Sequence, residues 1–171
     1  MSSYVISSLA KQHDRTQFSC GDELLDRYLS KQASQEIKRR ISAVFVLIEQ
    51  GNSVVKGYYT LSATSVLLHE LPNTLQKKSP KYPSLPATLI GRLAVDKTVQ
   101  GEGVGEQLLV DALIRAYQHS QDIGSMAIVV DAIDEPAKRF YLHYDFLAFD
   151  SYDQKLFLPM TEIKKLLDGR C

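Results

Sequence analysis

The sequence predicts a mixed α/β domain, in which helices flank one central sheet that contains both parallel and antiparallel strands. Two observations predict this class. Strand-like and helix-like segments alternate along the chain in the order β-α-β-β-loop-β-α-β-α-β-β. The 171 residues, 44% of them apolar, suffice for one sizeable core, and no repeat or low-complexity tract marks a boundary. We therefore expect a single domain over residues 1–171.

The N-terminal part of the chain predicts one strand, one helix and a hairpin. Residues 4–9 alternate in polarity, as an edge strand does. Residues 20–40 hold apolar side chains at helical spacing, with Asp22 near the start as a capping residue. Residues 41–66 hold two β-rich runs on either side of a Gln-Gly-Asn-Ser turn, which predicts a hairpin.

The rest of the chain alternates between strands and helices after a proline-rich stretch. Four prolines between residues 69 and 86 predict a loop or a broken short helix. Residues 104–120 form the clearest helix, because their apolar side chains share one face. Residues 125–132 are a continuous apolar run, typical of a strand buried on both faces. The other expected elements are strands at residues 87–96, 146–150 and 154–160, and helices at residues 135–143 and 161–168.

Composition narrows the class of protein. The formal net charge is zero, so bulk charge does not indicate a polyanion binder, although a local basic patch can still bind one. Two cysteines, Cys20 and Cys171, are too few for a disulfide framework, and the four histidines lack metal-ligand spacing, so we expect no metal site. No signal peptide opens the chain and no apolar run is long enough for a bilayer, which predicts a cytoplasmic protein without a membrane partner.

Three glycines at alternate positions, in the stretch VQGEGVGEQLL at residues 99–109, stand between a strand and a helix. A helix N-terminus exposes N–H groups and carries partial positive charge, so such a turn suits a phosphate. A P-loop would need Lys-Ser/Thr from Glu106 onward, and a dinucleotide fingerprint would need glycine at that position. The spacing that remains is Gln/Arg-x-x-Gly-x-Gly, met by Gln100, Gly103 and Gly105. A glycine-rich loop without a ligand is the alternative.

This spacing resembles the pyrophosphate-binding turn of the GNAT acetyltransferases, which use acetyl-CoA. The resemblance implies a GNAT-like fold, in which the strand before the turn pairs with the pantetheine arm of coenzyme A. It also implies that a backbone N–H of that strand meets the oxyanion of the thioester. The residues that it assigns to acetyl-CoA are Leu93, Ala94 and Val95 on the strand, and Gln100, Gly101, Gly103, Val104 and Gly105 in the turn.

A second stretch, DEPAKRFYLHYDF at residues 134–146, resembles the closing motif of the same family. Asp134, Ala137 and Tyr141 keep the spacing of its Asn-x-x-Ala-x-x-x-Tyr helix, which assigns all three to the cofactor. The resemblance makes Tyr141 the catalytic acid that protonates the departing thiolate. Asp134 stands where asparagine is common, which puts a family side-chain contact in doubt. Asp145 stands where glycine is common, which predicts a turn of a different shape.

Most of the chain resembles a narrower group, the GNAT toxins of bacterial toxin–antitoxin pairs. The similar stretches are FSCGDELLDRYL at residues 18–29, GRLAVDKTVQGEGVGEQLLVDAL at residues 91–113 and VVDAIDEPAKRFYLHYDF at residues 129–146. The first discriminates most, because general GNAT enzymes do not share it. The resemblance implies acetylation of the α-amino group of aminoacyl-tRNA and a block of translation. The partners that it implies are a ribbon-helix-helix antitoxin, a second copy in a homodimer, and DNA only through the antitoxin.

The chemistry of acyl transfer suits an α-amine better than a lysine. A free α-amino group has a pKa of about 7.7–8.0, so about one in ten is neutral at pH 7, whereas a lysine at about 10.4 is neutral about once in 2,500. An α-amine therefore needs less help from a base, and no general base stands out, since Asp96 and Glu106 flank the turn without a required geometry. The phenol of Tyr141, with an ordinary pKa near 10, is close enough to a thiol at about 8.5 to act as its acid.

A tRNA acceptor predicts basic side chains that meet its phosphates. Arg92 is favoured because it lies next to the expected acyl site, and a solvated basic face is the alternative for each cluster. An acetyltransferase for a small amine or a protein N-terminus, and a non-catalytic module that binds acyl-CoA or pairs with an antitoxin, are the other functions that these motifs allow. The tRNA candidates are Arg92, Lys38, Arg39, Arg40, Lys77, Lys78 and Lys81.

Overall fold

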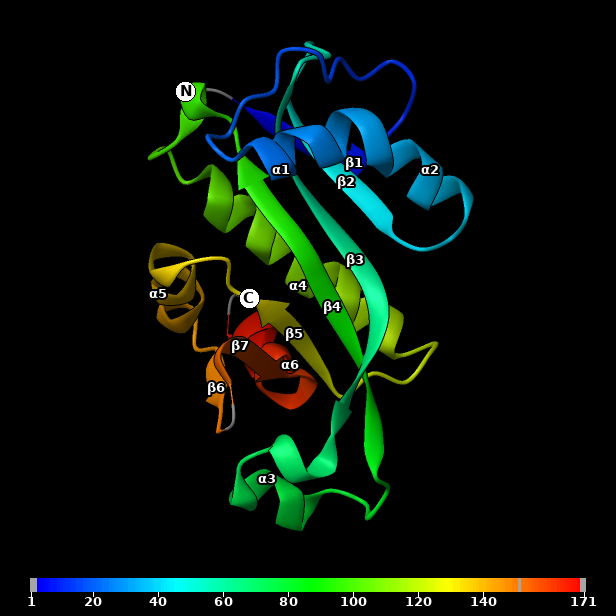
Figure 1. The fold of residues 1–171 in the computed structure, drawn as a ribbon, viewed down its shortest axis with the longest axis vertical. Coiled ribbons are helices and arrows are strands. Elements are labelled where there is room, and N and C mark those ends of the chain that lie inside the picture. Colours follow the sequence, from blue (N-terminus) through cyan, green and yellow to red (C-terminus); the bar gives the residue numbers. More distant parts are fainter. Residues whose placement is uncertain (1–2, 151, 170–171) are drawn as a thin grey trace. The chain divides into compact units, whose positions relative to one another are not determined.

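The structure is a computed structural model that describes residues 3–150 and 152–169, and it confirms the expected mixed α/β fold (Figure 1). The strands are β1 (Tyr4–Ser8), β2 (Ala43–Glu49), β3 (Val55–Leu67), β4 (Ser84–Val95), β5 (Ala127–Asp131), β6 (Leu147–Phe149) and β7 (Tyr152–Pro159). They pair in the order β1-β2-β3-β4-β5-β7-β6. β5 runs parallel to β4, whereas the pairs β1–β2, β2–β3, β5–β7 and β6–β7 are antiparallel, so the sheet is mixed.

Six α-helices accompany the strands in the described residues: α1 (Glu23–Arg27), α2 (Ala33–Lys38), α3 (Asn73–Lys78), α4 (Val104–Ser120), α5 (Glu135–His143) and α6 (Met160–Asp168). None of these helices is long and apolar enough to cross a membrane. The chain divides into two compact units, of which unit 1 is Met1–Ser62 with Gly91–Ala112 and unit 2 is Ala63–Ile90 with Leu113–Cys171. The assignment of residues 1–171 to one domain remains a prediction, and Cys171 lies outside the described residues.

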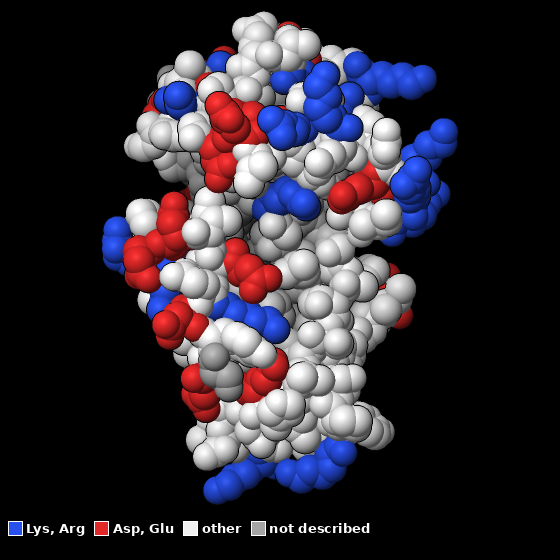
Figure 2. Space-filling view, viewed as in Figure 1, with Lys and Arg blue, Asp and Glu red and all other residues white. Residues whose placement is uncertain are grey.

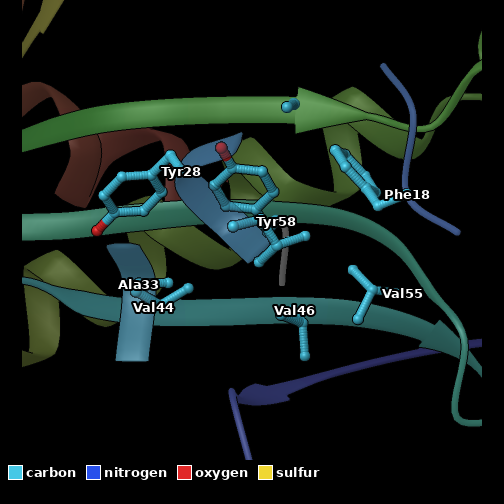
Figure 3. Close-up of a cluster of buried hydrophobic side chains, with 9 residues drawn as sticks. Phe18, Tyr28, Ala33, Val44, Val46, Val55 and Tyr58 are labelled. Carbon is cyan, nitrogen blue, oxygen red and sulfur yellow. The ribbon is translucent and has the colours of Figure 1, made fainter. Parts of the chain in front are cut away.

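In unit 1, a π-helical turn at Tyr28–Gln32 interrupts the helix that was expected over residues 20–40. α1 precedes this turn and α2 follows it. The adjacent residues Tyr28 and Leu29 are both only 1% exposed, because the wider turn lets two successive side chains face the core. Figure 3 shows the ring of Tyr28 beside Tyr58 of β3, above Val44 of β2. The break therefore serves the packing of α1 and α2 on the strands of unit 1.

The position of the start of α4 depends on its close approach to the backbone of β3 at Gly57. A Cβ on Gly57 of β3 would lie 2.9 Å from Cδ1 of Leu108 and 3.4 Å from Cγ1 of Val104. Both leucine and valine are fully buried on α4, so neither has room to move away. Glycine at position 57 thus lets the first turns of α4 pack directly on β3.

In unit 2, the proline-rich stretch contains α3, and β4 begins at Ser84, earlier than the expected strand at residues 87–96. Leu71 and Leu85 from this stretch pack in one core with Val129 of β5 and Phe157 of β7. The expected broken short helix is therefore present, and burial of its flanking leucines holds it in unit 2.

α5 ends in a turn of the kind that glycine ordinarily makes. Asp145 follows the helix with a φ of 70°, in the left-handed region. The N–H of Phe146 donates to the carbonyl of Tyr141 (3.2 Å), and the rings of these two residues lie 5.3 Å apart. The N–H of Asp145 donates to the carbonyl of Leu142 (3.1 Å). This pattern is the Schellman motif, so the expectation of a differently shaped turn at Asp145 is wrong: aspartate tolerates the same left-handed backbone.

We expect Asp145→Gly to raise the free energy of unfolding by about 0.5–1 kcal/mol, because glycine adopts the left-handed backbone without strain. Asp122→Gly is the matched control, since Asp122 also follows a helix but does not have a positive φ, and glycine there should lower the stability. Urea unfolding followed by circular dichroism measures both variants. An Asp145→Gly variant no more stable than the parent would show that the aspartate side chain offsets the strain.

Candidate active site

The turn at residues 100–103 has the backbone that an anion site needs. Gly101 and Gly103 have φ values of 82° and 80°, and a Cβ on either would meet no atom within 4 Å. Conformation, rather than space, thus requires glycine at both positions. The N–H of Gln107 donates to the carbonyl of Gly103 (3.1 Å), so the turn leads directly into a 17-residue helix. The N–H groups at the positive end of that helix suit a phosphate.

The strand and helix residues assigned to acetyl-CoA lie on either side of this turn. Leu93 and Val95 are half-buried at the end of β4, and Gly105 lies in the first turn of α4. Ala94 and Val104 are buried in the core of unit 1. A ligand contact by Ala94 or Val104 would therefore use backbone atoms.

Asp96, directly after β4, ties together segments that are distant in the sequence. Its buried carboxylate accepts hydrogen bonds from the N–H of Ser19 (2.9 Å) and from both the N–H (2.9 Å) and the hydroxyl (2.7 Å) of Thr98. The N–H of Lys97 donates to the carbonyl of Ser19 (2.8 Å). Burial by itself would raise the pKa of Asp96, but these hydrogen bonds and the charge of Lys56 outweigh it and lower the pKa. A carboxylate with these hydrogen bonds stabilises the fold by joining distant segments, and it is a poor general base.

The stretch at residues 18–29 contains Ser19, which forms hydrogen bonds with Asp96 and Lys97. Asp22 caps α1 by accepting hydrogen bonds from N–H groups of its first turn, and Asp26 accepts one from the N–H of Cys20 (2.9 Å). Burial raises the pKa of the Cys20 thiol to about 11, so the thiol is neutral, as in a packing residue. The side chain of Gln100 donates to the carbonyls of Cys20 and Val95. The side-chain NH₂ group of Gln100 is thus engaged in hydrogen bonds within the protein.

Tyr141 lies on α5 in unit 2 and is 7% exposed. The rings of Phe140 and Phe146 meet it edge to face, with centroids 5.2 and 5.3 Å away. Burial raises the pKa of Tyr141, and no hydrogen bond of its hydroxyl to a described residue contributes to the shift. The phenol is therefore protonated at neutral pH, as a proton donor must be.

Asp134 and Ala137 form the start of the same helix. The carboxylate of Asp134 accepts a hydrogen bond from the N–H of Ala137 (2.9 Å), which makes Asp134 the N-cap of α5. An asparagine could cap the helix in the same way, so the departure from the family pattern leaves the local structure intact. Ala137 is half-buried, one turn before Tyr141.

Arg92, on β4 in unit 1, stacks on an aromatic ring. Its guanidinium carbon lies 3.6 Å from the ring centroid of Tyr28. The hydroxyl of Tyr28 donates to the carboxylate of Glu36 (2.8 Å), which also accepts a hydrogen bond from Ser42 (3.1 Å). Burial and the bond to Glu36 raise the pKa of Tyr28 to about 12, so a neutral ring lies beneath the cation. A stacked guanidinium is held in orientation while its N–H donors remain at its edge.

The other basic candidates are exposed and belong to different units. Lys38 ends α2 in unit 1, and Arg39 and Arg40 follow it. Lys77 and Lys78 end α3 in unit 2. Figure 2 shows Lys and Arg side chains gathered over α1 and α2, and a second group over α3. The two groups are therefore separate candidates for an anionic partner.

Sequence reasoning missed the roles of Asp96 and Tyr28. The pattern Asp-x-Thr occurs at residues 14–16 and 96–98, and in both copies the aspartate accepts the N–H and the hydroxyl of the threonine. This pattern predicts a local turn, but nothing in it shows that Ser19 takes the remaining acceptor position of Asp96. Among the described residues, no group of three His, Cys, Asp or Glu side chains could hold a metal ion.

Known proteins resemble this chain over most of its length. Residues 84–167 match the family described as an acetyltransferase (GNAT) domain. The tRNA-acetylating toxin of Mycobacterium tuberculosis is 36% identical over 154 residues, which cover 90% of this chain and 90% of that protein. A structure of AtaT complexed with acetyl-methionyl-tRNAfMet has a TM-score of 0.90 and 29% identity, and covers 96% of this chain and 99% of its own. A Tyr-to-Phe mutant of the AtaT toxin, bound to acetyl-CoA and the C-terminus of the antitoxin AtaR, has a TM-score of 0.80 and 25% identity, with 96% and 98% covered.

We expect Asp96→Asn to lower the free energy of unfolding by about 2 kcal/mol at pH 7, because the amide is uncharged and accepts fewer hydrogen bonds. Asp14→Asn is the control, since the carboxylate of Asp14 makes the same turn with Thr16 but is less buried and bonds only Thr16 and Gln17, so its loss should be smaller.

The effect of Asp96→Asn should also depend on pH. Folding lowers the pKa of Asp96, so its ionised form stabilises the protein fully above the ordinary carboxyl pKa of about 3.9. The difference between the two proteins should shrink as the pH falls through the lowered pKa. Chemical unfolding at pH 7 and pH 3 measures this difference. Equal losses in the Asp14 and Asp96 variants would place the energy in the local turn instead of the bond to Ser19.

Proposed function

The chain belongs to the GNAT acetyltransferase family, and we propose that it is a toxin that acetylates the α-amino group of aminoacyl-tRNA with acetyl-CoA and so blocks translation. The observation that carries the proposal is the 36% identity with a tRNA-acetylating toxin over 90% of both chains. The likeness to the tRNA complex of AtaT, which extends over nearly the whole chain, supports the same acceptor.

The turn at residues 100–103 fits the pyrophosphate of acetyl-CoA. Its two left-handed glycines leave the N–H groups without a Cβ in the way, and the positive end of α4 favours a dianion. When bound, acetyl-CoA supplies an acetyl group activated as a thioester. The proposed contacts are Leu93, Ala94, Val95, Gln100, Gly101, Gly103, Val104 and Gly105 in unit 1, and Asp134, Ala137 and Tyr141 in unit 2.

Tyr141 is the proposed catalytic acid. The transfer forms a bond between the acceptor nitrogen and the acetyl carbon and breaks the bond between that carbon and sulfur. The nitrogen loses one proton to solvent, the departing thiolate takes one from Tyr141, and the resulting phenolate regains a proton from solvent. The phenol of Tyr141 holds its proton at neutral pH, because burial raises its pKa. The same loss of hydration raises the pKa of a neighbouring thiol, so the pKa values of acid and acceptor shift in the same direction.

An α-amino group is the acceptor that this site suits. Asp96 is engaged in three hydrogen bonds and is unavailable as a base. About one α-amino group in ten is neutral at pH 7 without assistance. The reaction therefore does not require a dedicated base, as it would for a lysine.

Recognition of tRNA and control by an antitoxin complete the proposal. Arg92 is the leading tRNA contact, because Tyr28 holds its guanidinium in place. The exposed basic groups at the ends of α2 and α3 are further phosphate contacts. We propose a ribbon-helix-helix antitoxin as partner, a homodimer, contact with DNA only through the antitoxin, and a cytoplasmic location, where charged tRNA is found.

The direct test is to incubate the purified protein with acetyl-CoA and total charged tRNA and to identify the acetylated product. We expect N-acetylated aminoacyl-tRNA, and growth arrest when the protein is expressed without its antitoxin. Acetylation of small amines or protein N-termini without a tRNA product would overturn the tRNA assignment. A folded protein that transfers no acetyl group would overturn the enzymatic one.

We expect Tyr141→Phe to lower kcat on aminoacyl-tRNA about 10²–10⁴-fold, because phenylalanine keeps the packing and removes only the proton donor. The affinity for acetyl-CoA should stay within about threefold, since the lost interaction belongs to the transition state. Tyr117→Phe, at a half-buried tyrosine of α4, is the control and should keep its activity. Steady-state kinetics decide the matter. A Tyr141→Phe variant with more than about a third of the parental kcat would mean that Tyr141 only lines the site.

We expect Arg92→Gln to raise the KM for aminoacyl-tRNA several-fold and to reduce the salt dependence of tRNA binding by about one phosphate contact. The Kd for acetyl-CoA should change little. Lys164→Gln removes an exposed charge on α6 and serves as the control. Binding titrations over a range of salt concentrations provide the measurement. Equal losses for tRNA and acetyl-CoA would identify Arg92 as a structural residue.

A further inference from the structure

The side chain of Gln100 joins two segments that flank the glycine turn. Its amide nitrogen donates to the carbonyl of Cys20 at 3.0 Å and to the carbonyl of Val95 at 2.9 Å. Cys20 precedes Gln100 by 80 residues, whereas Val95 ends β4. An amide NH₂ group has two hydrogens to donate, so this arrangement uses both of them.

The carbonyl of Cys20 is itself held in place. The N–H of Cys20 donates to Asp26 on α1 (2.9 Å). The neighbouring Ser19 is bound at both ends, since its N–H donates to Asp96 (2.9 Å) and its carbonyl accepts from Lys97 (2.8 Å). Residues 19–22, which we call the strap, therefore connect the start of α1 to the segment that follows β4.

We propose that Gln100 is a positioning residue for acetyl-CoA, which acts through Cys20 and Val95 and not by side-chain contact with the ligand. Gln100 stands immediately before Gly101, whose φ of 82° belongs to a residue with wide conformational freedom. A turn that contains two such glycines needs an external tie to hold one conformation. The strap and the end of β4 provide that tie at the residue where the turn begins.

The two hydrogen bonds of Gln100 should affect the Kd for acetyl-CoA more than the kcat of the transfer. A turn that is already ordered loses less conformational entropy when it closes on an anion, so its affinity is higher. Both side-chain hydrogens of Gln100 are donated to the carbonyls of Cys20 and Val95, so we expect the rate at saturation to be unaffected. The identity of the ligand rests on the proposed function, but the two hydrogen bonds do not.

The test is a calorimetric titration of acetyl-CoA into variants of Gln100. Gln100→Met keeps the length of the side chain and removes both donors, and we expect its Kd to rise about tenfold with kcat at saturation and the KM for aminoacyl-tRNA nearly unchanged. Gln100→Arg keeps donors that reach both carbonyls and should restore most of the affinity. Gln118→Met, at an exposed glutamine of α4, is the control and should bind as the parent does.

Titrations at about 0.1 and 0.5 M salt separate the tie from the added charge of arginine, because attraction by charge fades with screening. Gln100→Lys, which has one flexible point of donation, should fall between the methionine and arginine variants and serves if Gln100→Met does not fold. Unchanged affinity in a folded Gln100→Met, or a loss that Gln100→Arg does not restore at high salt, would overturn the inference. A parent protein that binds no acetyl-CoA would overturn the proposed function instead.

Discussion

The hydrogen bond between the carboxylate of Asp96 and the N–H of Ser19 is the contact on which the structure of unit 1 depends. It joins the residue after β4 to a segment 77 residues earlier, and Asp96 itself is only 4% exposed. An ionised carboxylate in such a place is stable only while its acceptor positions are filled, and Ser19 and Thr98 fill them. The start of α1, the end of β4 and the glycine turn therefore take up one arrangement together.

The candidate functional groups are each supported by buried neighbours. Arg92 stacks on Tyr28, whose hydroxyl is bound to Glu36 of α2, so its charge is held in orientation by the core. The start of α4 packs on β3 at Gly57, where no side chain intervenes. In unit 2, Tyr141 lies near the end of α5, where Phe146 packs against its ring and donates a hydrogen bond to its carbonyl. Such support reduces the side-chain entropy that is lost when a ligand is bound.

The sequence predicts the regular elements well where local periodicity decides them. The helices at residues 104–120 and 135–143 have the expected bounds: an apolar face defines the first, and the N-cap Asp134 starts the second. The π-helical turn at Tyr28 is invisible to a helical period, since it depends on which side chains the strands accept. The prediction of a new turn shape at Asp145 was wrong for another reason. It rested on the absence of glycine, but aspartate tolerates the left-handed backbone. Glycine spacing located the turn of the candidate site, but the partner of Gln100 lies 80 residues away, beyond any local pattern.

The strap has a consequence for the order of events during biosynthesis. Unit 1 is built from two stretches of chain that Ala63–Ile90 of unit 2 separates. Ser19 and Cys20 leave the ribosome early, but Ser19 meets Asp96 and Lys97, and the carbonyl of Cys20 meets Gln100, only after those residues follow. Contacts so distant in sequence close slowly, because a long loop must first lose its freedom. A protein proposed to consume the ribosome's own substrate thus secures its glycine turn only when more than half of its chain has been translated.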